Sequence, residues 1–239
     1  MDHHSFLASG SQQNQRGNSV NKNTLYTQIT RAKRHKESEL ENTYLRSCAL
    51  KLAQQGDYIE AIALLSELIN SYPDNAVNYN NRGLIYFQSG DSQKALRDYN
   101  TAMQLNPKLA SAYNNRANYY AAGGELVAAL TDYDQALDLN PRHVRAWINR
   151  GITLRDLSQY AEAIDNFEMV LLFGQLQGNI WAERGRTYHL WGDWNCAIAD
   201  YYRSLSHLNS LDNNHDISVY RLRLQLENWL NELLNPYLN

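Results

Sequence analysis

Asparagine recurs at a fixed interval of 34 residues in this 239-residue chain, at Asn81, Asn115 and Asn149. The same interval leads back to Ser47 and forward to Glu183. A carboxamide both donates and accepts hydrogen bonds, so a row of such side chains could bind the backbone of an extended peptide whatever its side chains. Asparagine is a poor helix former, and its repeated use favours this role over the alternative of an idle, solvated side chain.

The residue after each asparagine position forms a second series, of arginines. Each arginine is followed 16 residues later by a carboxylate or an amide, and we predict that the two side chains pair within one repeat, because a charge buried alone is costly. Cys48 and Leu64 replace both partners together at the start of the series, as pairing requires. The rival arrangement pairs each arginine with the preceding repeat, as in Arg116–Asp98. The predicted pairs are Arg82–Asp98, Arg116–Asp132 and Arg184–Asp200, with Arg150 facing Asn166 as the weak member.

Catalytic chemistry has no support in the sequence. It contains no nucleophile–base motif, phosphate loop or metal-ligand spacing, and its seven histidines are scattered. We therefore predict that the protein is not an enzyme, holds no metal and needs no cofactor. A net charge of only −3 argues against nucleic-acid binding by the whole chain. Cys48 and Cys196 lie in different repeats and are too distant to pair. Two unpaired thiols are typical of a reducing compartment, and the sequence shows no apolar leader or membrane span. We therefore predict a cytoplasmic protein.

The elements that must position these side chains follow from Pro73, Pro107 and Pro141, which are also 34 residues apart. With each proline at position 32 of a repeat, position 20 is alanine five times, while positions 4 and 24 are large and apolar. Small residues let two helices approach closely, and the large ones fill the space around that contact. Glycine, or Ser158, turns the chain near position 15, and proline ends the second helix. The pattern predicts five helix–turn–helix units, at residues 42–75, 76–109, 110–143, 144–177 and 178–211.

The pattern Tyr79…Gly83…Tyr86…Gly90…Ala95…Tyr99…Ala102…Pro107 closely resembles the tetratricopeptide repeat, and the resemblance covers residues 42 to about 211. It implies an all-α, right-handed superhelical solenoid in which the first helix of each unit lines a concave groove. The asparagines would stack along this groove beside apolar and basic side chains. The partner-binding residues implied in this way are Arg46, Asn80, Asn81, Leu84, Phe87, Asn114, Asn115, Asn118, Arg145, Asn149, Ile152, Arg155, Arg186 and His189.

The two ends of the chain differ from the repeats. Residues 1–23 form a polar, basic tail that is predicted to be disordered, and residues 24–41 form a helical extension. Six basic side chains and one acidic one fall within residues 1–36. The amphipathic stretch 216–235 predicts a helix that caps the last unit, with a dimerising helix as the alternative. In the last unit, Trp194 is expected to be packed. Trp191 is expected to rest against this helix, with an exposed position on a contact surface as the alternative.

These observations predict an adaptor that binds an extended segment of another protein in the groove, with an acidic group and apolar anchors. The Tyr-Asn-Asn-Arg-Gly style of repeat is similar to those common in bacterial proteins. Two alternatives stay open. One is a self-assembling structural protein, a homo-oligomer built through the C-terminal helix. The other is nucleic-acid binding through the basic N-terminal segment.

Overall fold

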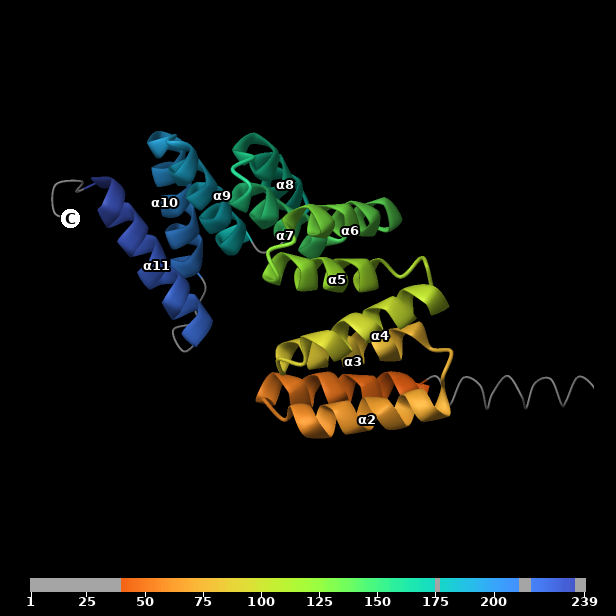
Figure 1. Ribbon diagram of the computed structural model, residues 1–239. Coiled ribbons are helices and arrows are strands. Elements are labelled where there is room, and N and C mark those ends of the chain that lie inside the picture. The colour runs from red at the N-terminus through yellow and green to blue at the C-terminus, as the bar shows by residue number, and fades with distance from the viewer. Residues whose placement is uncertain (1–39, 175–176, 211–215, 235–239) are drawn as a thin grey trace, which may run out of the picture. The chain divides into compact units, whose positions relative to one another are not determined.

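The computed structural model describes residues 40–174, 177–210 and 216–234, and the regular structure within these ranges is helical (Figure 1). The chain divides into two compact units, residues 1–44 and 45–239. Residues 40–44 are the described part of the first unit, and they are helical. The predicted tail and nearly all of the predicted extension lie outside the described residues. Every predicted site residue belongs to the second unit.

Helices in the second unit follow one another in pairs. Each helix from α3 to α10 packs against its partner in a pair, and the second helix of a pair also contacts the first helix of the next. This arrangement confirms the all-α solenoid fold class. The boundaries of the five units stay a prediction. After the helical residues 45–55, the helices are α2 (Tyr58–Ser71), α3 (Ala76–Gln88), α4 (Ser92–Leu105), α5 (Ala110–Ala122), α6 (Leu126–Leu139), α7 (Val144–Asp156), α8 (Tyr160–Leu172), α9 (Gln177–Trp191), α10 (Trp194–Ser210) and α11 (Ile217–Leu234).

Close approach between paired helices depends on small residues at the contact. A Cβ atom added to Gly83 would lie 2.8 Å from Cε1 of Tyr99, and one added to Gly185 would lie 2.8 Å from Cδ1 of Tyr201. The tyrosine rings therefore occupy the space that a side chain would need, and both are fully buried. This packing fixes how the first helix of each pair lies on the second.

The turn inside each pair uses a left-handed backbone at the same repeat position. The φ angle is +93° at Gly56, +90° at Gly90, +79° at Gly124 and +90° at Gly192. Ser158 takes the equivalent place with a φ of +61°. Glycine adopts this conformation without the Cβ penalty that a serine carries. The five turns therefore share one geometry even where the sequence departs from glycine.

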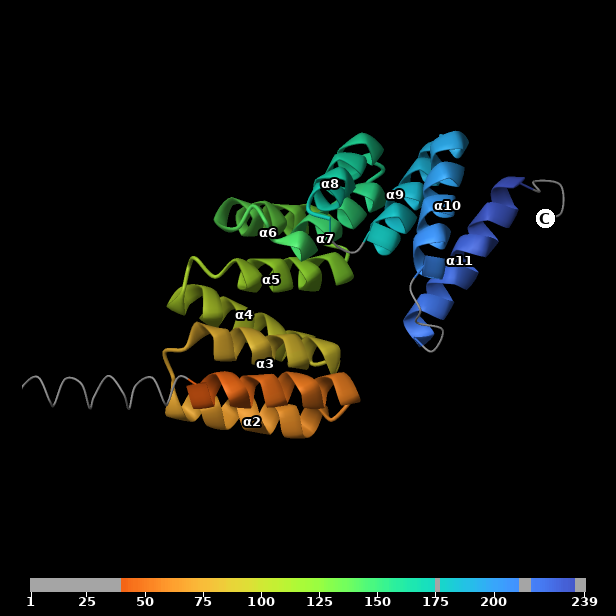
Figure 2. The same ribbon diagram turned by 180° about the vertical axis from the view of Figure 1, so that it is seen from behind.

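The final helix, α11, lies against α10 in both views of the molecule (Figure 1, Figure 2). Leu226 and Leu230 of α11 are buried in one apolar cluster with Tyr201 and Leu208 of α10. The indole ring of Trp229 stacks on Tyr201, with ring centroids 5.4 Å apart. The helix thus covers apolar side chains that no sixth repeat covers, which is the capping role expected of it.

Candidate functional site

The first helices of successive pairs contact one another: α3 contacts α5, α5 contacts α7 and α7 contacts α9. Most of the predicted binding residues lie on these helices, and Arg46 lies on the helical residues 45–55 before them. We call the surface formed by repeat positions 2, 5, 6, 9 and 12 of these helices the A-helix face.

The asparagines of α3 and α5 bond to one another in a single chain of amides. Asn114 donates to the Oδ1 atom of Asn115 at 3.2 Å, and Asn115 donates to the Oδ1 atom of Asn80 at 2.9 Å. Asn80 in turn donates to the Oδ1 atom of Asn81 at 3.4 Å. Asn80, Asn114 and Asn115 are buried, whereas Asn81 is half-buried. The amides therefore join one repeat to the next. Asn81 is the last amide in this hydrogen-bonded row, and it lies nearest to solvent.

A second amide cluster joins α5, α6 and α7. Asn149 donates to the Oδ1 atom of Asn118 at 2.8 Å, and the hydroxyl of Tyr133 donates to the same oxygen at 2.6 Å. Burial raises the pKa of Tyr133 to about 12, so its hydroxyl stays protonated as the donor. One repeat earlier, the hydroxyl of Tyr99 is buried without a partner among the described residues, because Leu84 stands where the next repeat has Asn118.

The repeats thus supply a matched pair of tyrosines for one experiment. Tyr133→Phe is expected to lower the free energy of unfolding by about 1 kcal/mol, because it removes a satisfied hydrogen bond. Tyr99→Phe removes a hydroxyl that has no partner, and we expect no loss or a small gain. Urea unfolding followed by circular dichroism measures both changes. Equal losses in the two variants would contradict the hydrogen-bond assignment.

Charged side chains dominate the other end of the A-helix face. Arg155 of α7 donates to Glu183 of α9 at 2.7 Å. The guanidinium of Arg186 lies 5.1 Å from the ring centroid of Trp229 and 3.8 Å from a carboxylate oxygen of Glu232, both on α11. Arg155 and Arg186 therefore already make contacts within the chain.

His189 lies beside this group. Its Nδ1 atom is 3.2 Å from Nη1 of Arg186 and 3.2 Å from the hydroxyl of Tyr201. Burial, together with the positive charge of Arg186, lowers the pKa of His189 below its usual value. The neutral ring favoured in this way can accept at Nδ1 from either neighbour.

The remaining predicted residues differ in how open they are. Leu84 and Phe87 of α3 are half-buried, and neither belongs to the apolar clusters formed by the described part of the chain. Ile152 packs against the core around Phe167. Arg46 donates to Asn78 at 3.3 Å, while Arg145 is exposed. Leu84 and Phe87 are thus the apolar side chains of the face that the fold itself uses least.

The structure brings together the arginine and aspartate partners that the sequence paired. Nε and Nη2 of Arg116 donate to the two carboxylate oxygens of Asp132 at 2.7 and 2.8 Å. Arg82–Asp98 and Arg184–Asp200 repeat this two-pronged geometry. The hydrogen bonds that Arg116 donates to Asp132 raise the pKa of Arg116. All three aspartates are buried.

Each of these arginines also reaches the preceding repeat, but at a residue other than the one in the rival arrangement, since Arg116 contacts Asn100 and not Asp98. The third nitrogen of Arg116 donates to Asn100 at 2.8 Å. Arg150 donates to Asn166 at 3.2 Å, as the predicted weak member, but its shortest contact is with Asp134 of the preceding repeat at 2.6 Å. A polar residue 16 positions before each arginine was the available sign of this bridge. These residues are Ser66, Asn100, Asp134 and Glu168.

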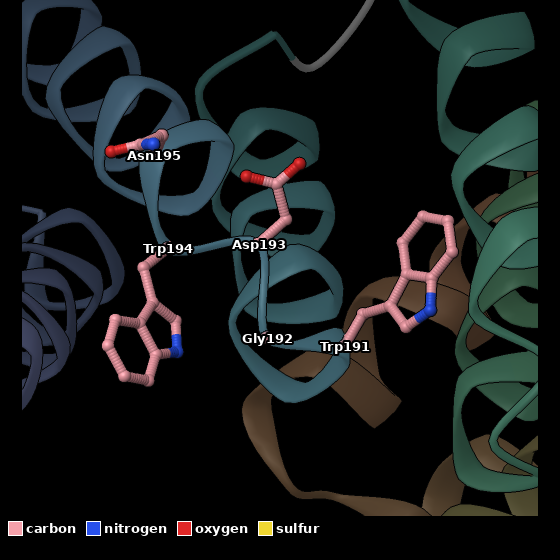
Figure 3. Close-up of a pocket in the computed structure, with 5 residues that line it drawn as sticks. All are labelled: Trp191, Gly192, Asp193, Trp194 and Asn195. Carbon is pink, nitrogen blue, oxygen red and sulfur yellow. The ribbon is translucent and has the colours of Figure 1, made fainter.

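A depression of about 480 Å³ lies at the turn between α9 and α10 (Figure 3). Its lining residues are Trp191, Gly192, Asp193, Trp194 and Asn195, and the two indole rings project on opposite sides of the turn. Trp191 is 51% exposed and Trp194 is 61% exposed. The exposure of Trp194 shows that the expectation of a packed side chain was wrong, and Trp191 does not belong to the apolar cluster that α11 forms with α10. None of the predicted binding residues lines this depression.

No helix within the described residues is both long and apolar enough to cross a membrane. No group of three or more histidine, cysteine, aspartate or glutamate side chains in them could hold a metal ion. The basic segment at residues 1–36, proposed as a nucleic-acid contact, lies outside the described residues.

Three overlapping segments of the chain match models of one repeat family. Residues 83–124 match a model described as TPR repeat, and residues 110–143 and 132–165 match two models described as tetratricopeptide repeat. No curated protein matches the sequence.

Solved structures with the same fold share less than a quarter of their residues with this chain. A tetratricopeptide repeat protein from Parabacteroides merdae is 23% identical over 80% of this chain and 74% of its own, with a TM-score of 0.60. A thermophilic TPR protein from Thermus thermophilus is 18% identical over 79% and 98%, with a TM-score of 0.66. PilW, a type IV pilus biogenesis factor, is 19% identical over 82% and 94%, with a TM-score of 0.65.

Proposed function

Because the chain belongs to the tetratricopeptide repeat family, we propose that it is an adaptor that binds an extended segment of another protein on its A-helix face. Proteins with this fold generally mediate protein–protein interactions, and stacked repeats offer long continuous surfaces for them. The finer assignment concerns which part of the face binds and which kind of segment it takes.

The observation that carries the assignment is the set of side chains on one side of α3. Leu84 and Phe87 are half-buried apolar residues outside the core clusters, and Asn81 lies one helical turn before Leu84. An amide at the end of a hydrogen-bonded chain can bond a peptide backbone, while the two apolar side chains accept apolar side chains of the partner. Apolar anchors with a nearby amide are what an extended peptide uses for binding.

Charge on α7 and α9 supports an acidic group in the same segment. Arg145 is exposed, so a partner carboxylate can approach it from solvent. Arg155 and Arg186 are held by Glu183 and Glu232, and a partner carboxylate would have to displace these groups. We therefore place the acidic group of the partner near Arg145, with the apolar anchors toward α3.

Two cysteines support a reducing compartment such as the bacterial cytoplasm for this adaptor. Cys48 and Cys196 are both free, and Cys196 is exposed. An exposed thiol persists where the surroundings are reducing.

The test compares two leucine variants in an affinity capture read by mass spectrometry. Leu84→Glu places a charge among the proposed apolar anchors, and we expect at least about tenfold less captured partner. Leu172→Glu, at a position 79% exposed on α8, should capture the partner as wild type does. Circular dichroism confirms that both variants are folded. Undiminished capture by Leu84→Glu would refute the proposed site.

A further inference from the structure

The last helix has two apolar faces, and the fold uses one of them. Leu226 and Leu230 point into the cluster shared with α10. On the opposite side of α11, Ile217 is 67% exposed, Tyr220 58% and Leu224 42%. These three residues fall on one stripe of the helix, since they are spaced by three and four positions. A cap needs an apolar inner face and a polar outer one, so this outer stripe is more apolar than capping requires.

Charges on the outer face are arranged symmetrically about Leu224. Arg221 lies three residues before it and Glu227 three residues after it, and both are exposed. Neither side chain forms an ion pair with another described residue. When two copies of a helix pack antiparallel with Leu224 at the centre, each Arg221 faces the Glu227 of the other copy. Tyr220 then faces Asn228, whose amide can bond a phenol hydroxyl.

We propose that the outer face of α11 binds a second copy of this chain through such an antiparallel pair. A twofold interface uses the same patch on both subunits and must complement itself. The arginine and glutamate satisfy this condition twice, and at the axis the Leu224 side chains of the two copies meet. A partner with a different patch would not need charges placed evenly about the central leucine.

The size of the contact predicts a weak dimer. An 18-residue helix is roughly 27 Å long and about 10 Å wide, so the contact covers about 270 Å² of each copy. Stable interfaces bury about 800 Å² on each partner. The dimer should therefore form only at high concentration and dissociate on dilution.

Sedimentation velocity over about 1 μM to 1 mM, a range suited to weak association, tests the proposal on the full chain. Wild type is expected to shift from monomer to dimer. Arg221→Glu sets Glu against Glu twice and Glu227→Arg sets Arg against Arg twice, so each variant alone should associate about tenfold more weakly. An equal mixture of the two variants restores both attractive pairs and should dimerise. The double variant Arg221→Glu, Glu227→Arg should also dimerise.

Three outcomes would overturn the proposal: a wild type that stays monomeric throughout, single variants that dimerise normally, or a mixture that does not recover. Both substitutions are on exposed positions, and unchanged circular dichroism shows that the fold is intact. Leu226→Asp is unsuitable as a probe, because Leu226 is fully buried and its loss would detach the helix. The result of this test is independent of the proposed adaptor function, because Arg221→Glu leaves the A-helix face unchanged.

Discussion

Replacing Arg116 by alanine is expected to lower the free energy of unfolding by about 3 kcal/mol, the low end of the range for one member of a buried pair. The substitution removes three hydrogen bonds, two to Asp132 and one to Asn100. It leaves the carboxylate of Asp132, which is 5% exposed, without its positive partner. We take the low end because the Arg116 side chain is itself 21% exposed, and water screens part of the charge.

Arg150 supplies the matched control for this prediction. It occupies the same repeat position on α7, but its carboxylate partner Asp134 is 55% exposed and its other partner, Asn166, is neutral. Arg150→Ala should therefore cost about 1 kcal/mol or less.

Denaturant unfolding of both variants, followed by far-ultraviolet circular dichroism, gives the comparison. Repeat arrays can unfold in stages, so each stage is fitted separately. Similar losses for Arg116→Ala and Arg150→Ala would show that the buried aspartate is not what makes the pair important.

The arginine pairs were predictable because both partners recur with the repeat. A spacing of 16 residues from Arg82 to Asp98 is kept from one unit to the next, and the first unit loses both partners together. The residues that bridge to the preceding unit were not identified, because their type varies: Ser66, Asn100, Asp134 and Glu168 share only polarity. Arg150 then follows the stronger partner, since Asn166 offers no charge.

The asparagine series shows the opposite limit of sequence reasoning. Its spacing places the amides on one face, but spacing does not say whether an amide points to solvent or to its neighbour. In the structure Asn115 donates to Asn80 and Asn149 donates to Asn118, so four of the predicted binding residues hold adjacent repeats together. These bonds offset the poor helix propensity of Asn115 and Asn149, and so account for these two members of the series without any ligand.

Contacts of α11 could not be predicted for a third reason. This helix has no counterpart in the repeats, so periodicity gives no register for it. The pairing of Arg186 with Trp229 and Glu232 depends on how α11 lies on α10. The amphipathic pattern predicted that a helix would cover the end of the solenoid, and that part was correct.

Tyr201 is the residue on which this end of the molecule depends most. Its ring is fully buried, it stacks on Trp229, and its hydroxyl bonds His189. Tyr201→Ala is expected to cost about 3–5 kcal/mol, because a large aromatic side chain leaves a cavity that the helices cannot close. The same change removes the surface on which Trp229 rests, so α11 should lose protection against hydrogen exchange.

The neighbouring tyrosine separates this effect from a general loss of aromatic surface. Tyr202 is 53% exposed on α10, and Tyr202→Ala should change the unfolding free energy by less than about 0.5 kcal/mol. Amide exchange read by mass spectrometry on residues 217–234 then gives a local measure besides global stability. If Tyr201→Ala lowers stability while exchange in α11 stays at the wild-type rate, the stacked ring is not what anchors the helix. Fast exchange confined to α11 would show that the cap is held by this contact, and that the outer face of α11 depends on it for its position.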